Sequence, residues 1–451
     1  MKRLVFLTGA ALASLATHGN VWTPQVSDVT MTQNGGVVTV AYTLDAPAIV
    51  TADFLTNGVS IGGTAIGELA GDASQLVSAA GRHTFSWRPS ETWYGEGANS
   101  LADVTVKVTA WSRTEGPDYL VVDLTETSSR RLSFYEREDL LPVGGLTNDL
   151  YRTTRLVMRR IPAKNATFAM GCSPKEPTYG RQDFVTVPAR TVSLTNDFYL
   201  GVFEATMAQV RTVFDYTTFD FTQLKQDTTP PYTRGTNGLD AAATTDGYPM
   251  SGFSYVQLRE NMDNGRSPGN TWPDKGHAVK RGAGRDNNCS VLGYFRDRTG
   301  LLFDLPTEAE WEFACRAGTT SDINDGTSLY PNGSSTEVAT RICDLGWIQN
   351  NSGTKQHVVG QKRPNAWGLY DMHGNAMEYC LDWYAGNVFA IAGELSPIGP
   401  AAASSSAEYR VRRGGHATHS ARAALSYARH SYKAAEQNAV NGFRLWCPAE
   451  F

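Results

Sequence analysis

Residues 365–379 read Asn-Ala-Trp-Gly-Leu-Tyr-Asp-Met-His-Gly-Asn-Ala-Met-Glu-Tyr and concentrate acidic, amide and glycine residues. Asp371, Asn375 and Glu378 carry the hard oxygen donors that Ca²⁺ prefers, and Gly374 permits a sharp turn that would aim backbone carbonyls at one point. The same residues also suit a metal-free turn in which Asn375 caps a helix over 376–384. The spacing alone leaves both interpretations open, and a helix over 376–384, which would place Glu378 next to the cation, is predicted in either case.

Five further blocks accompany this stretch in a fixed order. They are FAMG at 168–171, FYLGVFEAT at 198–206, DLPTEAEWEFACRAG at 304–318, RGG at 413–415 and GFR at 442–444. Together they resemble the formylglycine-generating enzyme family, also called sulfatase-modifying factors, whose signature GLYDMxGNVWEW is followed by RGGS and GFR. The resemblance covers residues 156–447, and it identifies the chain as a divergent member of that family.

The resemblance implies an α+β fold similar to a C-type lectin, with little regular secondary structure and with bound cations that stabilise the loops. It also implies one structural calcium ion. The ligands would be the side chain of Asp371, the backbone carbonyls of Gly374 and Ala376, and the acid Glu378. The family's second calcium site falls before Gln361, in a stretch without a clear residue match, so no ligand is assigned to it.

The residues that carry catalysis in the family are replaced here. Formylglycine-generating enzymes oxidise a substrate cysteine with O₂ through two cysteines that bind Cu(I), an ion for which soft thiolates are suitable ligands. The matching positions hold His419 and Ala424, the serine of RGGS is His416, and the tryptophan of VWEW is Met377. Copper and the parent activity are therefore not expected, and the chain is predicted to be a pseudoenzyme.

Three histidines suggest a different metal site, in which imidazoles would replace the thiolates. His416 and His419 lie three residues apart, and His430 follows. If the stretch is extended, however, the first two rings point to opposite faces, and no nearby carboxylate completes a facial triad. A histidine metal site is therefore disfavoured. The sulfoxide synthases of the same superfamily use an HxxxHxE iron motif, which this sequence does not contain.

Two functional hypotheses remain. The first is a calcium-stabilised binding module for a glycan, peptide or protein, since residues 413–441 are rich in adaptable polar side chains and aromatic anchors. The second is a metal-dependent oxidoreductase with altered chemistry. A plainer interpretation of residues 420–429 is that they fill the core. The candidate ligand surface comprises His416, His419, Arg422, Tyr427, His430 and Tyr432.

The composition excludes some partners. The chain has 451 residues, 41% of them hydrophobic, and 40 basic against 45 acidic side chains give a net charge of −5. With no run of Lys and Arg longer than two, nucleic acid is not an expected partner. The oligomeric state cannot be inferred.

The N-terminus has the pattern of a secretory signal peptide. Lys2 and Arg3 precede an apolar run over 4–15 that is too short for a stable membrane span, and small or polar residues follow. We expect cleavage near residue 19 and a periplasmic or extracellular mature protein. Six cysteines in an exported chain allow up to three disulfides in fifteen possible pairings.

The rest of the chain divides into three segments. Residues 20–113 alternate turn clusters with β-rich runs at 37–44, 48–54, 83–87 and 101–111, which predicts a β-sandwich of immunoglobulin or fibronectin type. Residues 114–154 are a predicted connector, and 155–451 form the family domain. Within it, Thr307 and Glu310 form a capping box for a helix ending at Arg316, so Glu308 and Glu310 are interpreted as helix-start residues rather than a catalytic pair.

Overall fold

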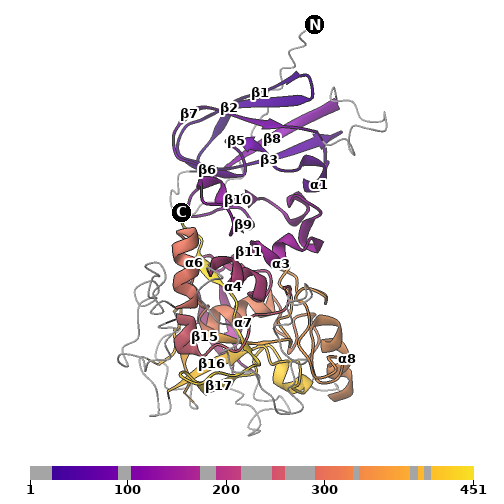
Figure 1. The fold of residues 1–451 in the computed structure, drawn as a ribbon, viewed down its shortest axis with the longest axis vertical. Helices are drawn as coiled ribbons and strands as arrows, with labels where there is room; N and C mark the ends of the chain where they lie inside the picture. Colours follow the sequence, from indigo (N-terminus) through magenta and orange to yellow (C-terminus); the bar gives the residue numbers. More distant parts are fainter. Residues whose placement is uncertain are drawn as a thin grey trace. The chain divides into compact units, whose positions relative to one another are not determined.

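The computed structural model describes residues 23–89, 103–172, 189–214, 246–259, 290–328, 335–385, 395–400 and 408–451. The chain divides into two compact units, Met1–Tyr151 with Ala449–Phe451, and Arg152–Pro448 (Figure 1). The predicted signal segment over 1–19 lies outside the described residues. Among those described, no helix is long and apolar enough to cross a membrane.

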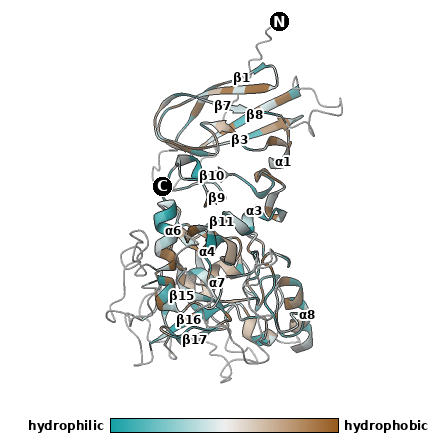
Figure 2. Cartoon of the chain, in the orientation of Figure 1, coloured by the Kyte–Doolittle hydropathy of each residue, from teal (hydrophilic) through white to brown (hydrophobic). Residues whose placement is uncertain are grey.

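The first unit is a β-sandwich. One sheet has the order β1-β2-β7-β5, and in the other β3 pairs with β4, β6 and β8. Side chains from both sheets share one core that includes Tyr42, Phe54 and Trp87, and polar and apolar residues alternate along the strands (Figure 2). The predicted β-rich N-terminal region is confirmed. The strand bounds are β1 Val26–Asn34, β2 Val37–Leu44, β3 Ala48–Thr56, β4 Val59–Ser60, β5 Ala70–Gly71, β6 Gln75–Val77, β7 Gly81–Trp87 and β8 Val104–Trp111.

Short elements complete the first unit. Strands β9 (Tyr119–Asp123) and β10 (Leu132–Tyr135) pair antiparallel. Helix α1 (Gly63–Ile66) packs so closely on the 3-10 helix η3 (Glu138–Leu140) that a Cβ added at Gly63 would lie 2.2 Å from the Leu140 carbonyl oxygen. The remaining short helices are η2 Ser129–Arg131 and η4 Gly145–Thr147, and the division between the two units falls within helix α3 Leu150–Thr153.

Three small sheets organise the second unit. Strands β11 (Arg155–Ile161), β14 (Phe198–Gly201) and β19 (Trp446–Pro448) form consecutive antiparallel pairs, and β12 (Thr167–Met170) pairs with β13 (Arg190–Ser193). The third sheet has the order β17-β16-β15-β18. Its strands are β15 Met377–Trp383, β16 Tyr409–Arg413, β17 His430–Lys433 and β18 Asn441–Gly442.

Helix α7 (Glu308–Arg316) lies against β15 and β16 (Figure 1). The predicted capping box is confirmed, because Thr307 Oγ1 accepts from Glu310 N at 3.2 Å and Glu310 Oε2 accepts from Thr307 N at 2.8 Å. The other helices are α4 Met207–Val213, α5 Tyr255–Arg259, α6 Val291–Thr299, α8 Ser335–Leu345 and the 3-10 helix η7 Ala421–Ala424.

The helix predicted over 376–384 is wrong. Residues Met377–Trp383 form the strand β15, and all seven are buried. Strand β16 pairs with it on one side and β18 on the other. These partners are distant in sequence, and a short buried run gives no local period that would separate a strand from a helix.

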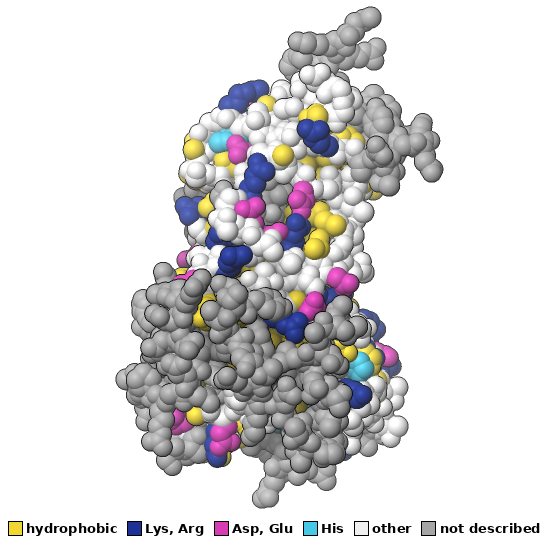
Figure 3. Space-filling view, in the orientation of Figure 1, with side chains coloured by type: hydrophobic (Ala, Val, Ile, Leu, Met, Phe, Trp, Pro, Cys, Tyr) yellow, Lys and Arg dark blue, Asp and Glu magenta, His cyan; other side chains and the backbone are white. Residues whose placement is uncertain are grey.

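Charged side chains are scattered on the visible face of the first unit, with Lys and Arg close to Asp and Glu (Figure 3). The mixed α+β fold class expected from the sequence, with a β-rich N-terminal region followed by sparse regular structure, is confirmed.

Candidate functional site

The loop over 371–376 is held in an unusual backbone conformation. Asp371, Gly374 and Asn375 have φ values of 58°, 136° and 63°. A Cβ at Gly374 would lie 2.2 Å from the carbonyl oxygen of Trp347, and Asn375 N donates to that oxygen at 2.8 Å. Such backbone persists only where its surroundings determine it, so the loop is fixed by its contact with Trp347.

Three buried carboxylates meet one arginine beside this loop. Glu378 accepts from Arg444 Nη2 at 2.7 Å and from Trp311 Nε1 at 2.7 Å. Glu204 accepts from Ala376 N at 2.8 Å and from Asn375 Nδ2 at 2.6 Å. Asp371 Oδ2 accepts from the backbone amide of Gly360 at 2.7 Å.

This acidic cluster, Glu204, Asp371 and Glu378, is short of positive charge. Burial, and then the neighbouring Asp371 and Glu378, raise the pKa of Glu204 well above its usual value, and Arg444 opposes the shift. Burial also raises the pKa of Asp371 to about 6. Arg444 acts on all three acids and Arg152 also acts on Asp371, so the acids still outnumber the guanidiniums. This excess favours a further cation, because buried charges are normally compensated.

The donors fit the implied calcium ion in part. Asp371 Oδ1 is buried and has no hydrogen-bond partner, the state expected of an oxygen that a cation would coordinate. Both oxygens of Glu378 already accept from Arg444, and Oε2 also accepts from Trp311. In the part of the chain that the structure describes, no group of three or more His, Cys, Asp or Glu is placed to hold a metal ion. An ion here would depend on Asp371 and on the carbonyls of Gly374 and Ala376.

Glu204 is the acid that the sequence analysis missed. It lies in the quoted block over 198–206, between β14 and α4, and is 0% exposed. The available signal was a lone acid inside an otherwise apolar stretch, which requires a buried partner. Its partners belong to a loop about 170 residues later, as the separation of 171 between Asn375 and Glu204 shows.

The predicted histidines come together. A turn in which His419 N donates to His416 O at 2.8 Å places the two rings 3.6 Å apart, and the His430 ring from β17 lies 5.0 Å from that of His419. The expectation that His416 and His419 point to opposite faces is therefore wrong, because the stretch turns instead of extending. We call His416, His419 and His430 the histidine cluster.

The histidine cluster is neutral. Burial is the largest cause in each ring, and it lowers the pKa of His419 to about 3 and that of His430 to about 4, with His416 lowered well below its usual value. The charge of Arg412 lowers all three further. Thr418 N lies 3.3 Å from His416 Nδ1, so this nitrogen accepts and the neutral ring carries its proton on Nε2.

His430→Gln is expected to weaken the pH dependence of folding. The unfolded ring titrates near pH 6.5 and the folded ring near 4, so protons bind the unfolded chain first and stability falls as pH drops from 6.5 toward 4. Between pH 7.5 and 5.5 the natural chain should lose about 1 kcal/mol more than the variant. Glutamine can still donate to the Ala423 carbonyl, which accepts from His430 Nε2 at 2.9 Å. Urea unfolding at both pH values measures this, and equal losses would contradict it.

The candidate ligand surface needs correction. Tyr427 is 1% exposed and packs in a hydrophobic cluster with Ile342 and Leu345 of α8, so it belongs to the core. His416 is 4% exposed. The other four are partly buried, and the ring of Tyr432 lies 4.8 Å from the guanidinium carbon of Arg412. They are His419, Arg422, His430 and Tyr432.

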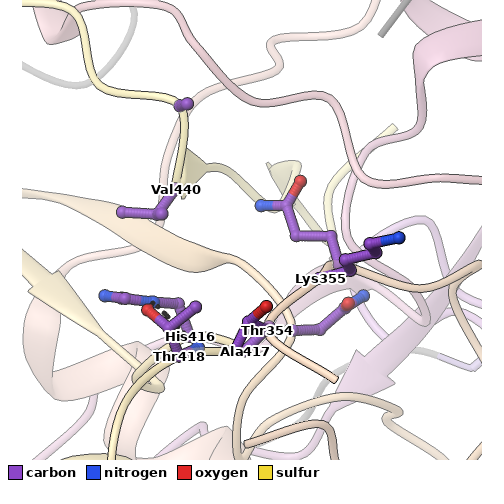
Figure 4. Close-up of a pocket in the computed structure, with 9 residues that line it drawn as sticks. Thr354, Lys355, His416, Ala417, Thr418 and Val440 are labelled. Carbon is purple, nitrogen blue, oxygen red and sulfur yellow. Dashed lines mark hydrogen bonds between the residues drawn. The ribbon is translucent and has the colours of Figure 1, made fainter. Parts of the chain in front are cut away.

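A small pocket opens next to His416 (Figure 4). Val440 faces His416, Ala417 and Thr418 across it, and Lys355 closes another side. It encloses about 340 Å³ of space free of atoms, its open mouth included. Of the candidate residues, only His416 lines it. The nine described lining residues are Thr354, Lys355, Gln356, Asn375, His416, Ala417, Thr418, Ala439 and Val440.

The described cysteines do not contribute to this pocket. Cys315, Cys343, Cys380 and Cys447 carry free thiols, and none of them lines it. Burial raises the pKa of Cys315 to about 12 and also raises those of Cys380 and Cys447. These thiols are protonated at neutral pH. Cys289 lies outside the described residues.

The family assignment rests on a sequence model. The family described as sulfatase-modifying factor enzyme 1-like domain matches residues 157–447, which is more than half of the chain. The chain therefore belongs to this family. The sheets and few helices of the structure agree with the α+β, C-type-lectin-like fold class that the resemblance implies.

Curated relatives match shorter segments. A formylglycine-generating enzyme of Streptomyces coelicolor is 32% identical over 141 residues, which cover 29% of this chain and 43% of that protein. Serine/threonine-protein kinase pkn1 of Chlamydia pneumoniae is 37% identical over 113 residues, covering 25% of this chain and 15% of the kinase. The matched segments thus span less than half of either relative.

Two solved structures are similar to this chain, with TM-scores below 0.5. Treponema denticola variable protein 1 has 25% identity and a TM-score of 0.41, with 65% of this chain and 96% of that chain covered. PvdO from Pseudomonas aeruginosa has 21% identity and a TM-score of 0.44, with coverages of 65% and 94%. Scores this low carry no argument about function.

Proposed function

We propose that the second unit is a non-catalytic ligand-binding module that has lost the copper oxidase activity of its family. The observation that carries the proposal is the pocket beside His416. At the two positions that match the copper-binding cysteines the chain has His419 and Ala424, and the described residues of the neighbouring pocket offer hydroxyl, amide, ammonium and imidazole groups but no thiol. Such groups recognise polar ligands and do not favour Cu(I).

The ligand would be a polar group of a glycan, peptide or protein. The pocket is small, so it would receive one functional group while surrounding residues contact the rest. The predicted signal peptide favours a periplasmic or extracellular setting, and the β-sandwich would then be an accessory module. Mass spectrometry of the secreted protein tests export, and a mature N-terminus that retains residues 1–19 would contradict it.

A glycan and peptide array tests the binding function. The mature chain should retain ligands in the presence of Ca²⁺, and Thr418→Trp should abolish retention because the indole would fill the pocket. Arg341→Gln, on an exposed position of α8, serves as the control and should bind normally. Retention that Thr418→Trp leaves unchanged would show that the pocket is not the binding site.

We also propose a structural Ca²⁺ held by Asp371, Gly374 and Ala376, with Glu378 and Glu204 contributing negative charge. A ligand bound only by the folded state stabilises it, by about 2.7 kcal/mol at 100 times its dissociation constant. EDTA should therefore lower the melting temperature of the natural chain and leave that of Asp371→Ala unchanged. Asp344→Ala, at an exposed position, should keep the EDTA response. An EDTA-insensitive natural chain would contradict the site.

The alternative, an oxidoreductase with altered metal chemistry, makes a different prediction about metal content. Purified protein that holds only calcium agrees with the binding module. Stoichiometric copper or iron that disappears in a His416→Ala, His419→Ala double variant would favour the oxidoreductase.

A further inference from the structure

The pocket beside His416 is lined by hydrogen-bond donors and lacks acids. None of its nine described lining residues is Asp or Glu. Lys355 contributes an ammonium group, and Thr354 and Thr418 contribute hydroxyls. Gln356 Nε2 is buried and has no hydrogen-bond partner among the described residues, while its Oε1 accepts from Ser251 Oγ at 3.1 Å. Gln356 thus carries a donor without a partner beside the pocket, and Lys355 gives the described pocket a net positive charge.

A buried cation lies behind one wall of this pocket. Arg412 is 8% exposed, and its Nη1 donates to Asn441 Oδ1, the residue after the pocket-lining Val440. Its Nη2 donates to Ser431 O at 2.7 Å, and its Nε has no partner. Within the described ranges no carboxylate lies within salt-bridge distance of Arg412.

Six other buried arginines in this unit have an acidic partner. Each of the six lies within 3.6 Å of an Asp or Glu oxygen, the usual compensation for a buried guanidinium. These are Arg259, Arg296, Arg316, Arg413, Arg429 and Arg444. Arg412 differs from these six in lacking an acidic partner among the described residues.

The groups nearest to Arg412 do not supply the missing charge. Its guanidinium meets the face of Tyr432, and Asn441 Nδ2 donates to Tyr379 Oη at 2.9 Å. The histidine cluster is neutral, and the positive charge of Arg412 lowers the pKa of all three rings. An anion that entered the pocket would meet Lys355 directly and would be attracted by Arg412 through a poorly solvated wall.

We propose that this pocket binds the carboxylate of an acidic peptide, with Lys355, Gln356 and Thr418 as contacts and Arg412 as a positioning charge. This inference rests on the proposed binding function and names its ligand chemistry. Apolar contact from Ala417, Ala439 and Val440 suits the methylene groups of a peptide carboxylate. No Trp, Tyr or Phe lines the described pocket, so it offers no broad aromatic face for a sugar ring.

Matched small peptides test the proposal. Acetyl-Gly-Glu-Gly-amide, acetyl-Gly-Gln-Gly-amide and acetyl-Gly-Gly-Gly with a free C-terminus are titrated against the full mature chain by ligand-observed NMR. At least one carboxylate peptide should bind tenfold or more tightly than the Gln peptide, and the preferred one identifies a side-chain or C-terminal source. Lys355→Gln should weaken binding at least fivefold, and because Lys355 is exposed its loss should not disturb folding. Arg341→Gln should bind like the natural chain.

Equal binding of the Glu, Gln and free C-terminal peptides, or an unchanged affinity in Lys355→Gln, would overturn the carboxylate assignment. Binding of a glucuronate oligosaccharide without binding of either carboxylate peptide would also overturn it and indicate an acidic glycan. The binding function stands separately, since neutral array ligands blocked by Thr418→Trp would support it while the carboxylate inference fails.

Discussion

Arg444→Met is expected to lower the free energy of unfolding of the second unit by about 3–5 kcal/mol, the usual effect of breaking a buried ion pair by removing one partner. Arg444 is 0% exposed and is the guanidinium that faces Glu378, Glu204 and Asp371. It also donates to the carbonyls of Gly201 and Tyr370 at 2.8 Å. Its loss removes the guanidinium that acts on all three acids, while Arg152 still acts on Asp371. Urea unfolding followed by tryptophan fluorescence measures the change.

Two control variants test whether the loss of stability in Arg444→Met comes from the lost charge or from the lost packing of the side chain. Adding Glu378→Gln to Arg444→Met should recover part of the loss, because the double variant removes one of the uncompensated charges. Lys433→Met breaks an exposed pair with Glu436 and should leave the unfolding midpoint unchanged. An additive double variant, or an Arg444→Met chain as stable as the natural one, would contradict this account of the cluster.

Gly374→Ala is expected to destabilise the second unit by about 4 kcal/mol or more, within the range that marks severe backbone and packing conflicts. The added Cβ would lie 2.2 Å from Trp347 O and 2.7 Å from Trp347 C, and both are backbone atoms that cannot rotate away. The φ of 136° adds strain for a residue with a side chain. The loop that positions Asp371 and Asn375 would have to leave residues 346–347.

Gly353→Ala is the matched control for this prediction. Gly353 has a φ of 60°, and a Cβ there would meet no atom within 4 Å. Only the left-handed backbone penalty of about 1–2 kcal/mol applies. Thermal unfolding of both variants compares the two effects. Similar losses in Gly353→Ala and Gly374→Ala would show that the contact with Trp347 is not tight.

Local signals in the sequence predicted the features that depend on neighbouring residues. The capping box of Thr307 and Glu310 fixed the start of α7, because both partners lie within one helical turn. Strands β2, β3, β7 and β8 fall on the predicted β-rich runs as far as these are described, since alternation and turn residues mark a sandwich strand locally.

Features made by distant residues could not be predicted from the sequence. Strand β15 is defined by β16 and β18, and the partners of Glu204 lie more than 170 residues away from it. The histidine cluster depends on a turn at His416 that local propensity did not reveal. Tyr427 has the residue type of a binding surface, but its packing against α8 places it in the core.

The candidate site was therefore predicted in part. His416 was identified because it replaces a residue of the family motif, and the structure places it in the wall of a pocket. Lys355 and Gln356 lie in a loop that has no family motif and no hydrophobic periodicity, so the sequence did not indicate them. Arg412 precedes the RGG block, yet its lack of an acidic partner among the described residues is visible only in the structure, where its Nη groups donate to Asn441 and Ser431.

Oxidation of a cysteine-containing peptide distinguishes a binding module from a copper oxidase. The mature chain is supplied with Cu(I) and O₂, and the peptide is analysed by mass spectrometry, with a formylglycine-generating enzyme that retains both copper-binding cysteines as the positive control. Since the family resemblance assigns the thiolate positions to His419 and Ala424, we expect the peptide to remain unchanged while the control converts it. Copper-dependent formation of formylglycine by this chain would contradict the account of a binding module that has lost its oxidase activity.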